Sequence, residues 1–179
     1  MKPLNLALIG FRATGKTTVG QILALSLKRS FIDMDRRLVE DAGLDITAWV
    51  ARNGWSSFRR AESGLLETLR LHTNLVLATG GGIVLDPKNR EALRKDFFTV
   101  WLKATRHTIL ARLDSDPQSR QTRPALSPLP LEEEVLKILC EREPFYTESA
   151  DLAIDTDSKA PSRIAREIEE GISVALNPV

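Results

Sequence analysis

Apolar residues in this 179-residue chain fall into short unbroken runs, separated by longer stretches in which they recur every three or four residues. The short runs predict five strands, in LNLALI, SFIDMD, NLVLATGGG, FFTVWLKA and DLAID. The longer stretches predict helices near residues 17–27, 35–42, 46–53, 56–71, 86–96, 105–113, 131–146 and 161–176. Strands that alternate with helices predict an α/β fold, in which a parallel sheet is covered on both faces. Ligands of such a sheet bind at the carboxyl ends of its strands.

The stretch from Asp114 to Pro130 interrupts this alternation. It carries four prolines between two helical patterns, which predicts a loop of about 15 residues. Loops of this length within a compact domain are usually functional, and we expect a mobile lid over about residues 114–128. The length of the chain favours one domain over residues 1–179.

Composition restricts the classes of partner. A net charge of +1 argues against a general nucleic-acid binder, and no apolar run approaches the ~20 residues of a membrane span. Cys140 is the single cysteine, which excludes an internal disulfide and fits a reducing compartment. Its apolar neighbours predict a core position on a helix. We therefore expect a cytoplasmic protein that binds neither nucleic acid nor membrane, with a mild preference for a monomer.

The segment LALIGFRATGKTTVG carries the strongest chemical signal. Gly10, Gly15, Lys16 and Thr17 fit the pattern G-x-x-x-x-G-K-[ST] of a phosphate-binding loop. The loop follows an apolar strand and opens a helix, so backbone N–H groups and the helix dipole point at a bound anion. Lys16 would reach the β- and γ-phosphates, and the Thr17 hydroxyl would ligate Mg²⁺. The sequence therefore predicts that the chain binds a nucleoside triphosphate.

Two carboxylates follow in the second predicted strand. Strand alternation places Asp33 and Asp35 on one side of its end, where a cation or a polar ligand would offset their repulsion. Asp33 is the better candidate for Mg²⁺, directly or through water, and Asp35 for a hydrogen bond from a substrate hydroxyl. The alternative for Asp35 is that it caps the next helix.

Two arginines point to a second, anionic ligand. Arg59 lies three residues before Glu62 on one helix face, where the carboxylate can orient the guanidinium for a bidentate contact. Arg142 continues the apolar stripe of its own helix, and an inward-facing arginine needs an anionic partner. The three glycines at 80–82 end a predicted strand, where backbone must approach another group closely.

Taken in order, the segments GFRATGKTTVG, FIDMD, FRRAE, TGGGIV, TRPAL and EREPFYTESAD resemble those of the shikimate kinase family. The resemblance spans about residues 6–160. It implies a three-layer P-loop NTPase fold of the nucleoside-monophosphate-kinase type, with a five-stranded parallel sheet and a lid. It also implies transfer of the γ-phosphate of ATP to the 3-hydroxyl of shikimate, with Mg²⁺ as cofactor and shikimate and ATP as the small-molecule partners.

The resemblance also implies roles for individual residues. The phosphate loop would cover residues 10–18, and a shikimate-binding helical region about residues 35–62. The catalytic residues would be Lys16, Asp35 and Arg123, the last stabilising the transferring phosphoryl group. The nucleotide-binding residues would be Gly10, Ala13, Thr14, Gly15, Lys16, Thr17, Thr18, Arg112, Arg123 and Lys159. The substrate-binding residues would be Asp35, Arg59, Gly81, Gly82 and Arg142, and the metal-binding residues Thr17 and Asp33.

The sequence departs from the family pattern at two positions. Ala13 stands where the family loop usually has glycine, and it is strained by ~1 kcal/mol if its φ is positive. Ser149 stands where valine is usual, and we expect no effect on the site.

Two other functions remain open at this stage. A kinase of another small carboxylated polyol, such as gluconate, fits the paired arginines equally well. A non-catalytic, ligand-sensing kinase-like protein would normally carry an appended domain, for which the chain has no room between its ends and the predicted elements.

Overall fold

The computed structural model describes residues 5–116 and 124–176. Its strands are β1 (Leu6–Ile9), β2 (Ser30–Asp33), β3 (Leu75–Ala78), β4 (Phe98–Lys103) and β5 (Leu152–Asp155). Its helices are α1 (Lys16–Ser26), α2 (Met34–Ala42), α3 (Ile46–Leu69), α4 (Pro87–Asp96), α5 (Arg106–Ser115), α7 (Leu131–Ser149) and α8 (Pro161–Leu176), with a 3₁₀ turn at Ile83–Leu85.

The five strands form one parallel sheet, as the sequence predicts, and their order in it is β2-β3-β1-β4-β5. β1 lies in the centre, with Leu8 paired to Ala78 of β3 and to Val100 of β4. The loop that follows β1 therefore leaves the sheet between two neighbouring strands. This position at the carboxyl ends of the central strands is where open α/β sheets bind ligands.

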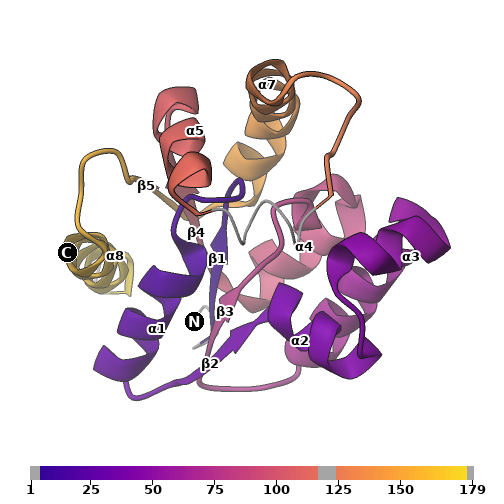
Figure 1. Cartoon of the computed structure of the whole chain (residues 1–179). Helices are drawn as coiled ribbons and strands as arrows, with labels where there is room; N and C mark the ends of the chain where they lie inside the picture. Colours follow the sequence, from indigo (N-terminus) through magenta and orange to yellow (C-terminus); the bar gives the residue numbers. More distant parts are fainter. Residues whose placement is uncertain (1–4, 117–123, 177–179) are drawn as a thin grey trace.

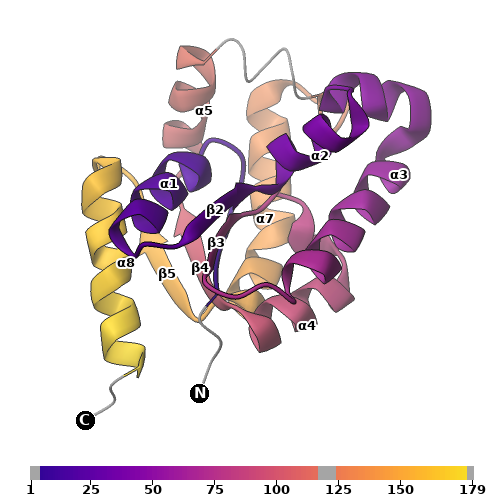
Figure 2. The same cartoon turned by 90° about the horizontal axis from the view of Figure 1, so that it is seen from below.

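Helices cover both faces of the sheet, which gives the three layers expected (Figure 1). Figure 2 shows α1 and α8 on one side of the strands and α3, α4 and α7 on the other. Side chains such as Leu8, Val100 and Ile168 form the core beneath α1 and α8. Leu77 and Tyr146 belong to a second core on the opposite face. The strands read as continuous apolar runs because both of their faces are buried.

The end of β2 differs from the prediction. The strand stops at Asp33, and α2 begins at Met34, so Asp33 and Asp35 do not share one side of a strand. The Asp33 carboxylate caps α2 by accepting a hydrogen bond from the Arg36 amide at 3.1 Å. Asp35 lies in the first turn of that helix. An aspartate cap favours helix over strand here, and it overrides the two-residue alternation of SFIDMD.

The two helices expected at 46–53 and 56–71 are confirmed. Together they make up α3, and they meet at Gly54, whose φ of 74° and ψ of 164° are not helical. Another local prediction is wrong. Cys140 is exposed, because it lies two residues beyond the buried Ile138 and so points about 200° around α7 from it. Ser149 is buried, and its hydroxyl donates to the Phe145 carbonyl at 2.7 Å.

The predicted lid lies only partly within the described residues. α5 continues to Ser115, so the first two residues of the expected loop are helical. Residues 117–123, which include Arg123, lie outside the described residues. Residues 124–130 lead without a helix or strand into α7. Over the described ranges, no helix combines the length and apolar character needed to cross a bilayer.

Candidate active site

The phosphate loop curls between β1 and α1 at the middle of the sheet. Gly10 has a φ of 140°, and a Cβ atom there would lie 2.5 Å from the Leu102 carbonyl oxygen of β4. The Lys16 ammonium donates to the carbonyls of Gly10 (2.9 Å) and Phe11 (2.7 Å), and the Thr14 hydroxyl donates to the Phe11 carbonyl at 2.9 Å. These bonds fix the curve of the loop around the N-terminus of α1.

The N-terminus of α1 suits an anion. Its N-cap is Gly15, with a φ of 94°, and no side chain caps the helix. The positive end of the helix dipole and the amides of the first turn therefore face the concave side of the loop. Lys16, the first residue of α1, is 9% exposed and lies where it can move from the two carbonyls to a phosphate.

Ala13 adopts the left-handed conformation that its glycine counterpart would favour, with a φ of 61°. The condition for strain is therefore met, and we expect a cost of about 1 kcal/mol. The Ala13 carbonyl accepts a hydrogen bond from Arg112 at 3.1 Å, and Arg112 also donates to the Thr156 carbonyl at 2.8 Å. Arg112 thus joins the loop to the turn after β5. Lys159 follows in that turn and pairs with Glu167 of α8 at 2.6 Å.

Thr17 and Asp33 lie side by side next to the loop. The Thr17 hydroxyl donates to a carboxylate oxygen of Asp33 at 2.5 Å. Both groups offer the hard oxygen ligands that Mg²⁺ prefers. No cluster of three His, Cys, Asp or Glu side chains occurs within residues 5–116 and 124–176. Mg²⁺ is commonly held by one or two protein oxygens with phosphates and water, so this pair fits it.

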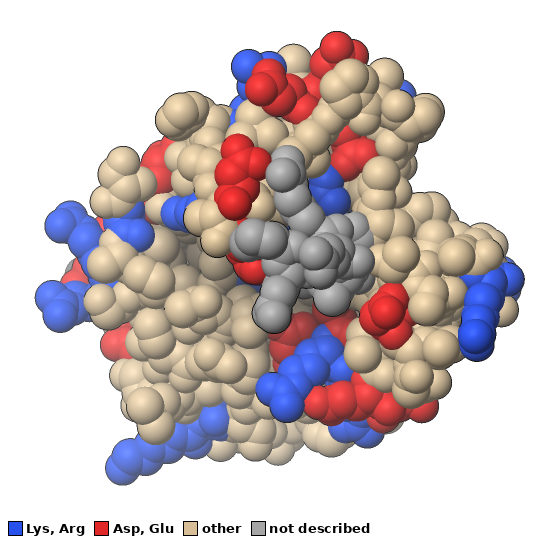
Figure 3. All heavy atoms as spheres, in the orientation of Figure 1, with Lys and Arg blue, Asp and Glu red and all other residues tan. Residues whose placement is uncertain are grey.

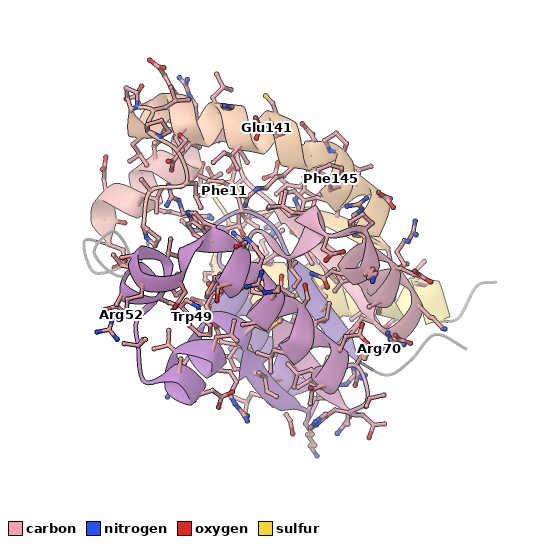
Figure 4. The ribbon with its side chains drawn as sticks, turned by 90° about the vertical axis from the view of Figure 1, so that its right-hand side faces the viewer. Phe11, Trp49, Arg52, Arg70, Glu141 and Phe145 are labelled. Atoms are coloured by element: carbon pink, nitrogen blue, oxygen red, sulfur yellow. The ribbon has the colours of Figure 1, made fainter. Side chains whose placement is uncertain are left out.

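A cleft with about 440 Å³ of empty space, part of it open to solvent, adjoins the loop. Its walls come from segments far apart in the sequence. They comprise Phe11, Arg12, Asp35, Ile46, Trp55, Phe58, Arg59, Glu62, Gly80, Gly81, Gly82, Pro124, Leu126 and Arg142. All five predicted substrate-binding residues are among them. Figure 4 views the molecule from the side of α2 and α3, with Phe11 lying between these helices and α7.

Arg59 and Glu62 form the ion pair that their spacing predicts. The Arg59 guanidinium also lies 4.9 Å from the centre of the Trp55 ring and 5.6 Å from that of the Phe58 ring, so three groups contact it. Glu62 is 1% exposed. Burial raises the pKa of Glu62 to about 7, and the Asp35 carboxylate adds to this while Arg59 opposes it. One of its oxygens, Oε1, has no hydrogen-bond partner in the described part of the chain.

Arg142 is 7% exposed and faces inward, as its place on the apolar stripe predicts. Among the described residues, its hydrogen-bond partner is a backbone carbonyl rather than a carboxylate. The guanidinium donates to the Gly81 carbonyl at 2.9 Å, and the Tyr146 hydroxyl donates to the same oxygen at 2.6 Å. Burial raises the pKa of Tyr146 to about 12, so the phenol stays a donor. Arg142 therefore presents a largely buried positive charge to the cleft.

The three consecutive glycines lie where the cleft and the loop meet. A Cβ at Gly80 would overlap the Glu62 carboxylate, and a Cβ at Gly82 would overlap the Arg59 guanidinium. A Cβ at Gly81 would lie 3.3 Å from the Gly10 carbonyl oxygen of the phosphate loop. A side chain at Gly80 or Gly82 would thus displace Glu62 or Arg59, and one at Gly81 would press on the phosphate loop, so each glycine permits a different close approach.

Sequence analysis missed several residues that line the cleft. Arg12 stands at a variable position of the loop motif, which gave no signal for a role on the substrate side. The apolar segment around Trp55 indicates a core or cleft-wall position, and Trp55 does line the cleft, but its contact with the Arg59 guanidinium was not expected, nor was that of Phe58. The available signal was the spacing of Trp55, Phe58 and Arg59, which places two aromatic rings and one cation on the same face of a helix.

On the face shown in Figure 3, acidic and basic side chains are interspersed among the described residues. No continuous basic stripe of the kind that follows a nucleic-acid backbone appears on that face.

Comparisons with known proteins agree on one family. A family model described as shikimate kinase matches residues 12–173. A shikimate kinase of Syntrophus aciditrophicus is 41% identical over 172 residues, covering 92% of this chain and 88% of that protein. The solved structure of a shikimate kinase from Acinetobacter baumannii, in complex with shikimate, matches with a TM-score of 0.90 at 31% identity. The match covers 99% of this chain and 96% of that one.

A more distant structure bears on the alternative substrate. A gluconokinase from Sinorhizobium meliloti matches with a TM-score of 0.58 at 15% identity, over 97% of this chain and 93% of that one. At this identity the likeness shows a shared fold alone.

Proposed function

Because the chain belongs to the shikimate kinase family and phosphorylates shikimate with ATP, we propose that the γ-phosphate passes to the 3-hydroxyl of shikimate in the cleft beside the phosphate loop. The observation that carries this proposal is the placement of Arg142. Within residues 5–116 and 124–176 its buried guanidinium has no acidic hydrogen-bond partner, and it opens onto a cleft that contacts the loop through Gly81.

The shikimate carboxylate would lie between Arg59 and Arg142. Two guanidinium groups can bind a carboxylate with several N–H···O bonds, which orients a small acid through its planar carboxylate as well as holding it. Asp35, in the first turn of α2, would accept hydrogen bonds from the ring hydroxyls. The amides of Gly81 and Gly82 would approach the ring. The Glu62 and Trp55 contacts hold Arg59 ready for this role.

The nucleotide would bind with its phosphates in the loop of residues 10–18. The amides at the start of α1 and the Lys16 ammonium would bind the β- and γ-phosphates, and Arg112 and Lys159 would lie on the adenine side. Transfer would proceed in line, without a covalent intermediate, by positioning and charge stabilisation. Asp35 would accept the proton of the attacking hydroxyl. Arg123, which lies outside the described residues, is proposed to stabilise the transferring group.

Thr17 and Asp33 would hold Mg²⁺ beside the phosphates. When bound, the ion supplies positive charge to the phosphate oxygens. The existing hydrogen bond between Thr17 and Asp33 keeps both oxygen ligands on one side of the loop.

We further propose a single domain over residues 1–179 that acts as a monomer in the cytoplasm, with shikimate and ATP as its partners and neither nucleic acid nor membrane. The mixed charges and the net charge of +1 support this proposal.

The test measures the release of ADP from ATP in the presence of Mg²⁺. Shikimate, quinate and gluconate are compared as acceptors. We expect ADP release that depends on shikimate, with little from gluconate. ADP release with gluconate alone would favour the other polyol kinase, and ligand binding without turnover would favour a sensor.

Asp35→Asn tests the proton role separately. We expect turnover to fall by roughly 100-fold while shikimate binding largely survives. Wild-type turnover in this variant would rule out an essential proton transfer to Asp35.

A further inference from the structure

An ion pair between Arg12 and Glu134 lies outside every role assigned above. Arg12 belongs to the phosphate loop, and Glu134 lies in the first turn of α7, 122 residues later. The side chains are 12% and 2% exposed, so the pair is largely shielded from water. Its neighbours Glu132 and Glu133 are exposed. Glu134 alone of these three acids reaches into the molecule.

The second oxygen of Glu134 holds another segment. Oε2 accepts hydrogen bonds from the amides of Leu126 (2.8 Å) and Ser127 (2.7 Å), and from the Ser127 hydroxyl at 3.3 Å. A buried carboxylate is costly unless both oxygens have partners, and here they do. One side chain therefore joins the phosphate loop, the start of α7 and the segment that precedes it.

The groups joined in this way form one wall of the substrate cleft. Arg12, Pro124 and Leu126 all line it. The curve of the phosphate loop has its own supports, because Lys16 and Thr14 bind its carbonyls independently of Glu134. Loss of Glu134 would therefore disturb this wall of the substrate cleft more than the part of the loop that binds phosphates.

We propose that Glu134 is a positioning residue for acceptor binding, and that it acts by fixing Arg12 and the backbone of residues 126–127 as one wall of the cleft. The proposal rests on the proposed function, because the acceptor is the molecule that this wall would contact. Arg12 adds a third guanidinium to a cleft that receives a carboxylated substrate. Arg59 and Arg142 approach from the α3 and α7 sides, whereas Arg12 approaches from the nucleotide loop.

The experiment compares Glu134→Gln with Glu133→Gln, an exposed neighbour on the same turn. For Glu134→Gln we expect the KM for shikimate to rise about tenfold, and the KM for ATP to change by less than about twofold. Glu133→Gln should match the wild type in both. Arg12→Met should raise the KM for shikimate by a similar factor, since it removes the other partner and leaves Glu134 bonded to residues 126–127.

The double variant separates a shared effect from two independent ones. If the two residues act through one contact, Arg12→Met combined with Glu134→Gln should cost no more than the worse single change. If the rises in KM of the two single variants multiply in the double variant, the proposal is overturned. It is also overturned if Glu134→Gln lowers the melting temperature and leaves the KM values for shikimate and ATP unchanged. If Glu134→Gln does not fold, the KM values of Arg12→Met alone decide, and unchanged values contradict the proposal. Absence of shikimate turnover in the wild type would instead overturn the proposed function.

Discussion

The nucleotide side of this molecule is formed mainly by backbone groups, whereas the acceptor side is formed mainly by side chains. The nucleotide side is one continuous segment, in which backbone amides, two glycines with positive φ and a single lysine surround the expected phosphates. The acceptor side is a set of charged and aromatic side chains from α2, α3, α7 and the loops between elements. Backbone amides suit a phosphate in any nucleotide, whereas we propose that the acceptor side selects its substrate through side chains that distant parts of the fold bring together.

The largest effect should come from the nucleotide side. Lys16→Met removes the only side-chain cation that the loop places at its centre, and we expect kcat to fall by about 100-fold or more. Shikimate binding in the absence of nucleotide, measured by equilibrium titration, should change little. Lys88→Met, an exposed change on α4, serves as the control. A loss of shikimate affinity as large as the loss of turnover would show that the two sides are not separate.

Arg142→Ala addresses the acceptor side. If this buried cation binds the substrate carboxylate as proposed, its removal should raise the KM for shikimate by roughly 30-fold, or about 2 kcal/mol. Binding of ATP should be retained, because Arg142 contacts Gly81 and not the phosphate loop. Arg106→Ala, at an exposed site on α5, controls for loss of a positive charge. An unchanged KM for shikimate would refute the role of Arg142.

Glu62 makes the acceptor side sensitive to pH. Its pKa in the folded protein is raised from 4.5 to about 7, so between these values the folded state holds a proton that the unfolded state has released. Stability therefore falls as pH rises through this window, by on the order of 1–3 kcal/mol. Urea unfolding of the wild type across this range should show the decrease, and Glu62→Gln, which cannot titrate, should lack it.

Glu67→Gln on the exposed side of α3 is the matched control for Glu62→Gln. It should keep the pH dependence of the wild type. A decrease in stability that persists in Glu62→Gln would assign the titration to another group.

The smallest effect concerns the backbone of the loop. Ala13→Gly should relieve the positive φ of Ala13 and raise the free energy of unfolding by up to about 1 kcal/mol, with kinetics nearly unchanged. The same change at Ala51, an exposed position in α3, should instead lower it by roughly 0.5–1 kcal/mol. Destabilisation by Ala13→Gly, measured by chemical denaturation, would show that Ala13 is not strained.

The contrast between the two sides also explains what the sequence could predict. The phosphate loop is contiguous, so its residues and their spacing identify it before any fold is known. The five strands and their parallel direction followed from buried apolar runs alternating with helices. Arg142 could be recognised because it continues an apolar stripe, and Arg59 because Glu62 lies one turn away.

The rest depends on contacts between distant residues. Arg12 and Glu134 are 122 residues apart, and nothing in either local sequence indicates that they meet. The boundary between β2 and α2 was wrong because the alternation of SFIDMD and the cap at Asp33 compete over the same residues. Cys140 was placed in the core because its apolar neighbours were read without their angles around the helix.

The most direct test of the central claim is to identify the product. ATP, Mg²⁺ and shikimate are incubated with the enzyme and followed by ³¹P and ¹H nuclear magnetic resonance. We predict one phosphate monoester coupled to the proton on carbon 3 of shikimate, formed in equal amount to ADP. Release of inorganic phosphate in place of the ester, or an ester at another hydroxyl, would contradict the account.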